Sequence, residues 1–195
     1  MIGIIDYGAG NIRSLGNALE RLGVEYVVSR SINELQHADK LILPGVGEAH
    51  STMQSLKQVG LVQWLKTIST PFLGICIGMQ ILFERSDERE TACLGIFPGT
   101  VAQFDPCRVK VPHMGWNQVS IRRDSRLFHN IRDGEFFYFV HSFYAPVSED
   151  TIGLTRYPGP FSAAVQRGNY YGVQFHAEKS GQAGLQILRN FVELC

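Results

Sequence analysis

The first 75 residues alternate short apolar runs with segments of helical periodicity. The runs Gly3–Ile5, Tyr26–Val28, Leu41–Leu43 and Pro71–Ile75 are nearly continuous in apolar residues and do not alternate with polar ones. Strands of this kind are buried on both faces, as in a parallel sheet that helices cover on both sides. The first half of the chain therefore predicts a layered α/β arrangement around a parallel sheet.

The rest of the chain predicts helices and shorter, antiparallel strands. Phe136–Val140 is the strongest strand signal, and Ala163–Gln166 with Tyr170–Phe175 predicts a hairpin. Apolar residues at helical spacing predict helices at Asn11–Leu22, Ile32–His37, Ala49–Lys57, Leu61–Ile68, Ile77–Phe83 and Gln182–Leu194. The expected fold is a three-layer, flavodoxin-like α/β domain with a mixed, mainly parallel central sheet flanked by helices.

Length and charge limit the number of domains and the class of partner. The 195 residues predict one domain, residues 1–195, because a core of this kind stays single up to roughly 200–250 residues. The 18 Lys and Arg residues balance 18 Asp and Glu residues. The chain therefore lacks the basic excess that binding to a nucleic-acid backbone requires, and nucleic acid is not an expected partner.

The pattern of apolar residues and cysteines favours the cytoplasm. Asp6 interrupts the apolar N-terminal run, which is not typical of a secretory leader. The longest nearly uncharged apolar stretch, Pro71–Phe83, has about a dozen residues, whereas a membrane-spanning helix needs ~20. The four cysteines form no Cys-x-x-Cys pair and are expected to be reduced thiols, three of them small buried side chains.

The segment Gly74-Ile75-Cys76-Ile77-Gly78 has the spacing of a nucleophile elbow between a strand and a helix. Such a turn strains the backbone at the nucleophile, and small residues two positions away on each side permit close approach of the chain. The thiol would lie at the carboxyl end of the sheet, where a helix N-terminus favours the thiolate. The alternative is a buried structural cysteine in a glycine-containing turn.

A cysteine nucleophile needs a base, and usually an acid that orients the base. Of the six histidines, His176 is the best placed, because it follows the strand Tyr171–Phe175 and precedes Glu178 by two positions. Two positions along an extended segment put both side chains on one side of the chain, so the carboxylate can orient the imidazole. The pattern predicts a triad of Cys76, His176 and Glu178; a structural histidine at a strand end is the alternative.

Three segments, in this order, resemble the class I (triad) glutamine amidotransferases: Pro44-Gly45-Val46-Gly47, Gly74-Ile75-Cys76-Ile77-Gly78-Met79-Gln80 and Phe175-His176-Ala177-Glu178. The resemblance covers essentially the whole chain. It implies the fold of that family and hydrolysis of L-glutamine to glutamate and ammonia, with no cofactor and no metal ion. One departure is Ala177, where the family usually has proline; alanine keeps its N–H, so we expect a looser turn.

The resemblance also implies a role for each member of the triad. Cys76 would attack the side-chain amide of glutamine, and His176 would protonate the departing ammonia. Glu178 would orient His176, and a water molecule activated by His176 would hydrolyse the γ-glutamyl thioester.

The binding groups implied by the same resemblance lie around the elbow and the glycine-rich turn. The oxyanion would be held by the backbone N–H of Ile77 and by one of Val46 and Gly47. Glycines on both sides of Val46 would allow that peptide to flip. The implied substrate-binding residues are Gly45, Gln80, Ser142 and Phe143.

Four further segments resemble the glutaminase subunits of imidazole glycerol phosphate synthases: Asp6–Asn11, Pro112–Asn117, Tyr138–Tyr144 and Glu178–Ser180. Those subunits act in histidine biosynthesis. The resemblance implies a heterodimer with a (β/α)8 cyclase subunit that uses the ammonia to form imidazole glycerol phosphate and an aminoimidazole carboxamide ribotide. The implied interface and ammonia-exit residues are Asn11, Pro112, Met114, Trp116, Tyr138 and Lys179.

Three alternative functions stay open at this point. A paralogous glutaminase subunit could feed ammonia to a different synthase, such as a sugar-modifying amidotransferase, because the glutaminase never touches the acceptor. A cysteine hydrolase or peptidase could share the elbow, although Gln80 and the Phe-His-x-Glu pattern argue against it. A silent binding module is disfavoured by the complete set of nucleophile, base and acid.

Overall fold

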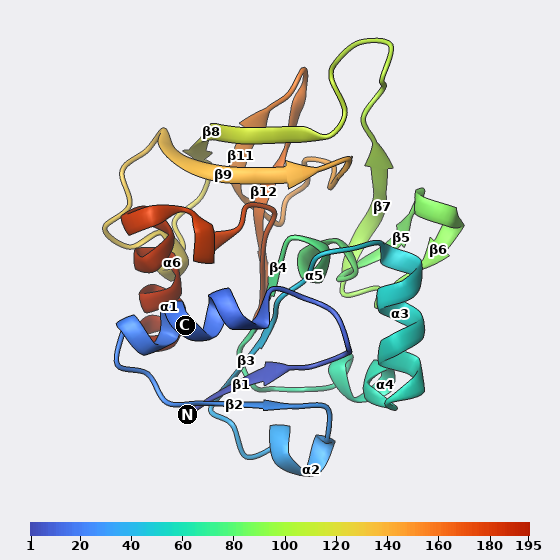
Figure 1. Ribbon diagram of the computed structural model, residues 1–195. Helices are drawn as coiled ribbons and strands as arrows, with labels where there is room; N and C mark the ends of the chain where they lie inside the picture. Colours follow the sequence, from blue (N-terminus) through green and yellow to red (C-terminus); the bar gives the residue numbers. More distant parts are fainter.

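The computed structural model describes residues 1–195 and contains two sheets (Figure 1). The strands of the larger sheet are β1 (Ile2–Ile5), β2 (Tyr26–Ser29), β3 (Lys40–Leu43), β4 (Phe72–Ile75), β8 (His113–Ile121), β9 (Glu135–His141), β11 (Thr151–Arg156), β12 (Pro160–Arg167) and β13 (Tyr170–Val173). Their order in this nine-stranded sheet is β2-β1-β3-β4-β13-β12-β11-β8-β9. The smaller sheet has the order β10-β7-β5-β6 and consists of β5 (Phe83–Ser86), β6 (Thr91–Ala92), β7 (Phe97–Gln103) and β10 (Phe143–Tyr144).

The larger sheet is mixed, as predicted. The strands from β2 to β13 in the spatial order pair in parallel. From β13 to β9 every pairing is antiparallel. The predicted hairpin is confirmed as β12 and β13, which turn at Gly168 and Asn169. The first half of the chain thus builds the parallel half of the sheet, and β13 joins it to the antiparallel half.

Helices cover both faces of the parallel strands. The chain contains α1 (Ile12–Arg21), α2 (Ile32–Leu35), α3 (Ala49–Gln58), α4 (Leu61–Leu65), α5 (Ile77–Gln80) and α6 (Gly181–Leu194), with short 3-10 turns at Glu88–Glu90, Arg126–Phe128 and Ala177–Lys179. Figure 1 shows α1 and α6 together on one side of the sheet and α3 with α4 on the other. No helix is both long enough and apolar enough to cross a membrane.

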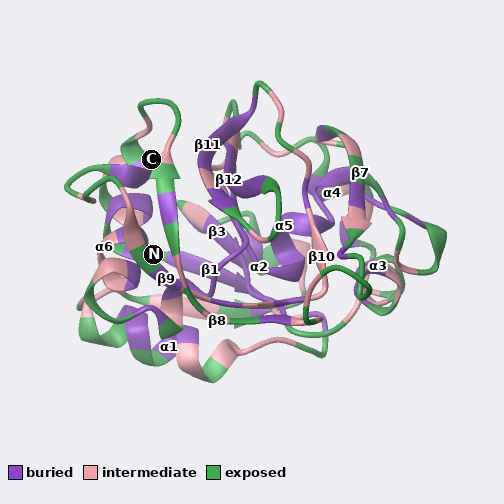
Figure 2. Ribbon diagram, turned by 90° about the horizontal axis from the view of Figure 1, so that it is seen from above, coloured by how far each residue is buried: buried purple, intermediate pink, exposed green.

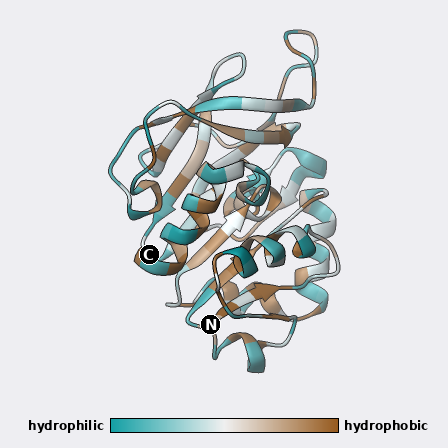
Figure 3. Cartoon of the chain, turned by 60° about the vertical axis from the view of Figure 1, so that its left-hand side comes forward, coloured by the Kyte–Doolittle hydropathy of each residue, from teal (hydrophilic) through white to brown (hydrophobic).

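Two apolar cores lie on the two faces of the central sheet, as the continuous apolar runs predict. Along β1, Ile2 and Ile4 pack into the core beneath α1 and α6, whereas Ile5 packs into the core beneath the other helices. This division follows from the two-residue period of a strand. The central strands are accordingly buried (Figure 2) and hydrophobic (Figure 3), whereas polar residues gather on the outer sides of the helices.

Three predicted helices and one predicted strand end earlier than expected. The helices predicted at Ile32–His37 and Leu61–Ile68 end at Leu35 and Leu65. The helix predicted at Ile77–Phe83 stops at Gln80, and Phe83 begins β5. Phe83 packs against Phe97 of the parallel strand β7, with 5.4 Å between the ring centroids. A short, fully buried apolar run does not distinguish helix from strand by periodicity, so the pairing with β7 decides it. The strand predicted to reach Phe175 ends at Val173.

The prediction that three cysteines are buried is wrong in part. All four thiols are free, and Cys93 is buried like Cys76. Cys107 is exposed and Cys195 is half-buried. Cys107 lies in the connection between β7 and β8, and connecting segments run over the surface.

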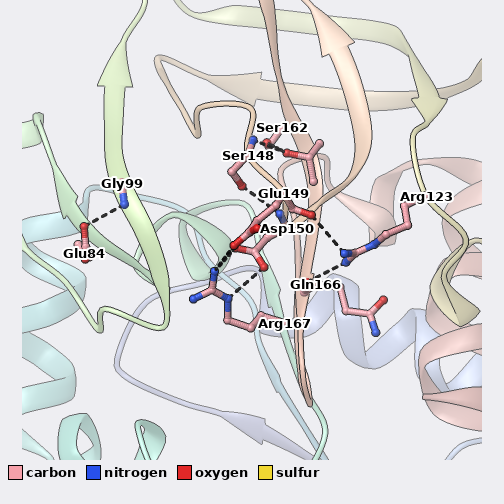
Figure 4. A network of polar contacts seen from close by, with 10 residues as sticks. Glu84, Gly99, Arg123, Ser148, Glu149, Asp150, Ser162, Gln166 and Arg167 are labelled. Carbon is pink, nitrogen blue, oxygen red and sulfur yellow. Dashed lines mark hydrogen bonds and ion pairs between the residues drawn. The ribbon is translucent and has the colours of Figure 1, made fainter.

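A network of polar contacts fixes the end of the β11–β12 region that lies away from the elbow (Figure 4). Arg167 binds Asp150 through two hydrogen bonds, of 3.0 Å from Nε and 2.6 Å from Nη2. Arg123 donates to the backbone carbonyls of Glu149 and Gln166. Arg167 pairs with Tyr170, the first residue of β13, so this network lies toward the amino ends of the parallel strands.

The turn from β4 to α5 is packed backbone against backbone. Cys76 has φ 55° and ψ −110°, a conformation that a non-glycine residue rarely adopts. A Cβ atom added at Gly74 would lie 2.3 Å from the carbonyl oxygen of Gly78, and one added at Gly78 would lie 2.2 Å from that of Leu43. Neither position has room for a side chain. The two glycines of the motif therefore let β3, β4 and α5 meet.

We predict that Gly78→Ala destabilises the fold by at least about 2 kcal/mol, because the added methyl group must push the β3 backbone away. Gly159→Ala is the matched control: a Cβ there meets no atom within 4 Å. Its effect should stay within about 0.5 kcal/mol. Urea unfolding followed by circular dichroism measures both. Equal stability of the two variants would contradict the close packing at the elbow.

Candidate active site

Eight of the ten predicted catalytic, oxyanion and substrate-binding residues line one cavity of about 330 Å³ at the carboxyl end of β4; Gly45 and Glu178 do not line it. Its lining consists of Val46, Gly47, Cys76, Ile77, Gln80, Glu88, Pro112, Val140, His141, Ser142, Phe143 and His176. A larger hollow of about 840 Å³ lies between Arg126 and the C-terminal end of α6, but it contains none of the predicted residues. No group of three or more His, Cys, Asp and Glu side chains is arranged to hold a metal ion.

The Cys76 thiol is almost fully buried at the base of this cavity, with 7% of the residue exposed. Its backbone N–H donates to the carbonyl of Val173 on the neighbouring strand, which holds the turn to the sheet. The sulfur lies 3.9 Å from the carbonyl oxygen of Val140 and 3.7 Å from Nε2 of Gln174. The thiol therefore faces one hydrogen-bond acceptor and one hydrogen-bond donor.

His176 and Glu178 form a buried pair, and each side chain is 1% exposed. Nδ1 of His176 lies 2.8 Å from Oε1 of Glu178, which also accepts a 3.2 Å hydrogen bond from the amide of Asn11. A carboxylate oxygen accepts, so Nδ1 carries the proton and the opposite nitrogen, Nε2, is left for another partner. Nε2 is buried and has no hydrogen-bond partner.

The pair forms by a different backbone path from the one expected. Ala177–Lys179 is a short 3-10 turn, so the two side chains meet across a turn and not along an extended segment. The backbone N–H of His176 donates to Tyr138, and its carbonyl accepts a 2.7 Å hydrogen bond from the Ser180 hydroxyl. These bonds anchor the histidine to β9 on one side and to the start of α6 on the other.

The surroundings of His176 favour its protonated form. Burial disfavours a charged imidazolium, but the interactions with Cys76 and Glu178 outweigh it and raise the pKa of His176 to about 10. The favourable interactions come from the Cys76 sulfur and from the Glu178 carboxylate, on the two sides of the ring. The site is thus suited to a thiolate–imidazolium pair.

The glycine-rich turn contributes one wall of the cavity. Val46 and Gly47 line it beside Ile77, and Gly47 has φ +117°, which favours glycine. Gly45, predicted to bind substrate, is buried and does not line the cavity. A Cβ atom there would lie 1.9 Å from Cγ2 of Ile77, so Gly45 is where the turn passes closest to the elbow.

Gln80, Ser142 and Phe143 line the cavity, but the amide nitrogen of Gln80 is already bonded within the protein. Nε2 of Gln80 donates 2.8 Å to the carbonyl of Phe143 and 2.9 Å to Oε1 of Gln174. Both amide hydrogens are therefore used. A contact of Gln80 with substrate has to come from its own Oε1.

Two histidines that the sequence did not single out form a hydrogen-bonded chain that runs from the cavity wall at His141 to His113. His141 Nδ1 lies 2.7 Å from the carbonyl of Phe143, so Nδ1 donates and Nε2 of His141 accepts from His113 Nδ1, 3.0 Å away. His113 Nε2 is then free to accept from Asn117. Burial lowers the pKa of His113 to about 4 and that of His141 to about 3, so both rings are neutral at pH 7.

Glu88 is a charged residue of the cavity that sequence reasoning missed. It belongs to the 3-10 turn after β5, and its Oε2 accepts a 2.6 Å hydrogen bond from the N–H of Ala49 at the start of α3. Burial raises the pKa of its carboxyl group. In the sequence it lies in the charged run Asp87–Glu90, which is typical of a solvated surface, and no signal separates it from its neighbours.

The predicted interface residues divide into two groups. Met114 and Trp116 are exposed, by 61% and 56%, and Lys179 is exposed. Tyr138 lies directly opposite Trp116 across β8 and β9, with 6.1 Å between the ring centroids.

The other two interface candidates, Asn11 and Pro112, lie close to the triad or the cavity. Asn11 is bonded to Glu178, and Pro112 lines the cavity itself. A further apolar side chain that the sequence did not single out, Phe136, is 45% exposed on the same pair of strands.

Comparison with known proteins identifies the family. Residues 3–195 match the family model described as "Glutamine amidotransferase class-I". A solved structure described as a glutamine amidotransferase superposes with a TM-score of 0.77 over 98% of this chain and 97% of that one, at 18% identity, which supports the fold. The chain belongs to the class-I glutamine amidotransferase family, and it is an enzyme of that class.

Curated relatives place it more narrowly within that family. It is 51% identical to the imidazole glycerol phosphate synthase subunit HisH of Bacteroides fragilis, over 99% of both chains. It is 46% identical to the subunit HisH of Vibrio parahaemolyticus, over 98% of this chain and 97% of the relative. The predicted family resemblance is confirmed at the level of this subunit group.

We predict that the imidazole ring of His176 stays protonated up to pH values well above 7, because its pKa is raised to about 10. Titration of the ring nitrogens by NMR measures this directly. His113 and His141 are internal controls and should stay neutral across the same range, since their pKa values are lowered. Cys76→Ala should lower the pKa of His176, because burial remains while the favourable charge is removed.

The same shift sets the pH range in which His176 stabilises the fold. A pKa raised above the ordinary value of 6.5 gives stability that is fully present below that value and is lost as the pH rises through about 10. The free energy of unfolding should therefore differ more between wild type and His176→Gln at about pH 6 than at about pH 10. A difference that grows with pH would contradict the assignment.

Proposed function

We propose that this protein is the glutaminase subunit of an imidazole glycerol phosphate synthase. It hydrolyses L-glutamine and supplies the ammonia to a (β/α)8 cyclase subunit in histidine biosynthesis. The observation that carries the proposal is that Cys76 and His176 line one cavity and that Glu178 is hydrogen-bonded to the far side of the His176 ring. The HisH relatives, at 51% and 46% identity over nearly the full length, supply the pathway.

In the first half of the reaction, the Cys76 thiolate attacks the side-chain carbonyl of glutamine. The negative charge that develops on the oxygen is met by the backbone N–H of Ile77, with one of Val46 and Gly47 as the second donor. His176 gives its Nε2 proton to the departing nitrogen, and ammonia leaves. Glu178 keeps the ring in the tautomer and orientation that this transfer requires.

In the second half, water hydrolyses the γ-glutamyl thioester. His176, now neutral, takes a proton from the water through the same Nε2 atom, and the hydroxide adds to the thioester carbonyl. Glutamate then leaves and the thiolate is restored. The buried and unbonded Nε2 is the group that this cycle needs free in both directions.

Recognition of the amino-acid end of glutamine requires charge inside the cavity. We assign the α-ammonium group to Glu88, which is the acidic residue of the cavity lining. The walls formed by Ser142 and Phe143 border the same space. Because the substrate carries no net charge, the neutral surface of the chain does not hinder its entry.

The partner surface that we propose is the exposed face of β8 and β9. Met114 and Trp116 on β8 and Phe136 and Tyr138 on β9 lie on one face, because directly opposed residues of an antiparallel pair share a face. Exposed aromatic residues and methionine are typical of interface centres. Lys179 lies one residue beyond Glu178, where it can bind a partner carboxylate near the path of ammonia.

The chain-wide family match fits a single glutamine amidotransferase domain, and the four free cysteines fit the reducing cytoplasm, to which the proposal assigns the protein. A paralogous subunit that feeds a different synthase is the competing function. An ammonia-transfer assay separates the two. Capture of the native partner, followed by addition of the carboxamide ribonucleotide and glutamine, should yield imidazole glycerol phosphate. A partner that does not convert this ribonucleotide would support the paralogous function.

We predict that Cys76→Ser lowers glutamine hydrolysis at least 1000-fold, on the order of what loss of a nucleophile costs, while folding and partner binding persist. Cys93→Ser is the matched control, because Cys93 is also buried but lies outside the cavity. Release of glutamate in the presence of the cyclase measures both. Retained activity of Cys76→Ser would remove the central claim.

We predict that Trp116→Ala weakens binding to the cyclase subunit about 30-fold or more, as expected for an aromatic interface anchor. Val28→Ala is the control, since Val28 is 41% exposed on β2, at the opposite edge of the central sheet. Isothermal titration calorimetry with the purified cyclase compares the two variants. Unchanged affinity for Trp116→Ala would place the interface elsewhere.

A further inference from the structure

Gln174 is a fully buried amide that touches the proposed nucleophile. It lies between the end of β13 and His176, and none of its surface is exposed. Its Nε2 atom donates to the sulfur of Cys76 at 3.7 Å, and its Oε1 atom accepts from Gln80 at 2.9 Å. The glutaminase mechanism above gives this residue no role.

The direction of every hydrogen bond around Gln174 is fixed by chemistry. The carbonyl of Phe143 can only accept, so the atom of Gln80 that faces it at 2.8 Å is the donor Nε2. The same Nε2 also reaches Gln174, so the amide oxygen of Gln174 faces Gln80. Its amide nitrogen must then face the sulfur.

The Phe143 carbonyl that starts this chain is itself fixed. It accepts a second hydrogen bond, from Nδ1 of His141 at 2.7 Å. Nε2 of His141 accepts from His113, and His113 accepts from Asn117. A line of bonds with defined directions thus runs from β8 to the sulfur, and turning the Gln174 amide would break it.

The two polar neighbours of the sulfur favour different protonation states. The carbonyl of Val140, 3.9 Å away, can accept a hydrogen bond only from the neutral thiol. The amide of Gln174 donates, so its bond becomes stronger when the sulfur is negative. A buried thiolate is costly unless donors surround it, and Gln174 is a donor positioned in advance at the bottom of the cavity.

We propose that Gln174 stabilises the reactive thiolate of Cys76 by donating a hydrogen bond to it, and that Gln80 holds the Gln174 amide in the donating orientation. The glutamine of the G-x-C-x-G-x-Q motif therefore acts on the nucleophile through Gln174. The reactive role of the thiolate rests on the proposed function, but the hydrogen bond itself does not.

The pH dependence of Cys76 alkylation tests the proposal without using glutamine. Iodoacetamide labels thiolates, and mass spectrometry of the peptide that contains Cys76 separates it from the other cysteines. Gln174→Met keeps the length and apolar stem of the side chain but has no donor. We expect the midpoint of its pH–rate profile to move up by about one pH unit, with roughly tenfold slower labelling below the midpoint.

A second variant and a matched control separate this role from a structural one. Gln174→Glu has the same shape, and its ionised carboxylate accepts but does not donate, so its midpoint should move up at least as far. Gln166→Met is the control: Gln166 is a half-buried glutamine on β12 that bonds Ser125 and Tyr171 and lies outside the cavity. Its labelling profile should match that of the wild type.

The outcomes for Gln174 and for the proposed function are distinguishable. Labelling profiles of Gln174→Met and Gln174→Glu that both coincide with wild type overturn the proposal, whatever the glutaminase assay shows. A shifted profile in a protein that does not hydrolyse glutamine keeps the hydrogen bond and overturns the proposed function. If the Gln174 hydrogen bond and the glutaminase function are both correct, Gln174→Met should lower kcat for glutamine hydrolysis about tenfold and leave KM nearly unchanged.

Discussion

The close backbone contact between β3, β4 and α5 is the constraint on which the site depends. Gly78 lies against the carbonyl of Leu43, and Gly74 lies against the carbonyl of Gly78. This packing holds Cys76 at φ 55° and brings the turn that contains Val46 to the same edge of the sheet. The carboxyl ends of parallel strands lie at the same edge of a sheet. The turn after β3 and the elbow after β4 are therefore neighbours, because β3 and β4 pair in parallel.

The buried polar groups around this edge divide into a bonded set and an unbonded set. Along the chain of hydrogen bonds that links Asn117, His113, His141, Gln80 and Gln174, every side-chain amide and imidazole has a hydrogen-bond partner, and each donor faces an acceptor. The buried side-chain atoms without a partner are the Tyr7 hydroxyl, Nε2 of His176 and Oε2 of Glu178. Unbonded buried groups are unfavourable, and natural proteins keep few of them. Nε2 of His176 and Oε2 of Glu178 belong to the proposed triad, and the proposed proton transfers require that Nε2 of His176 has no other partner.

Local sequence patterns predicted the parallel half of the fold well, because continuous apolar runs and helical spacing are properties of single segments. The elbow was predicted for the same reason: both glycines lie within two residues of Cys76. Phe83 was misassigned because its conformation depends on β7, which comes later in the chain. Glu88 and Gln174 carry no local signal, since their roles arise from Ala49, Gln80 and other residues that only the folded chain brings near.

The strand pair β8–β9 relates the proposed partner surface to the cavity. Side chains alternate between the two faces of a strand, so Trp116 and Tyr138 point outward while His113 and His141 point inward. His141 fixes the carbonyl of Phe143, and Val140, the preceding residue of β9, lines the cavity. The strand pair β8–β9 therefore carries both the proposed partner surface and part of the cavity wall. A partner bound to the proposed surface would contact the same strand pair that contributes Val140 and His141 to the cavity wall.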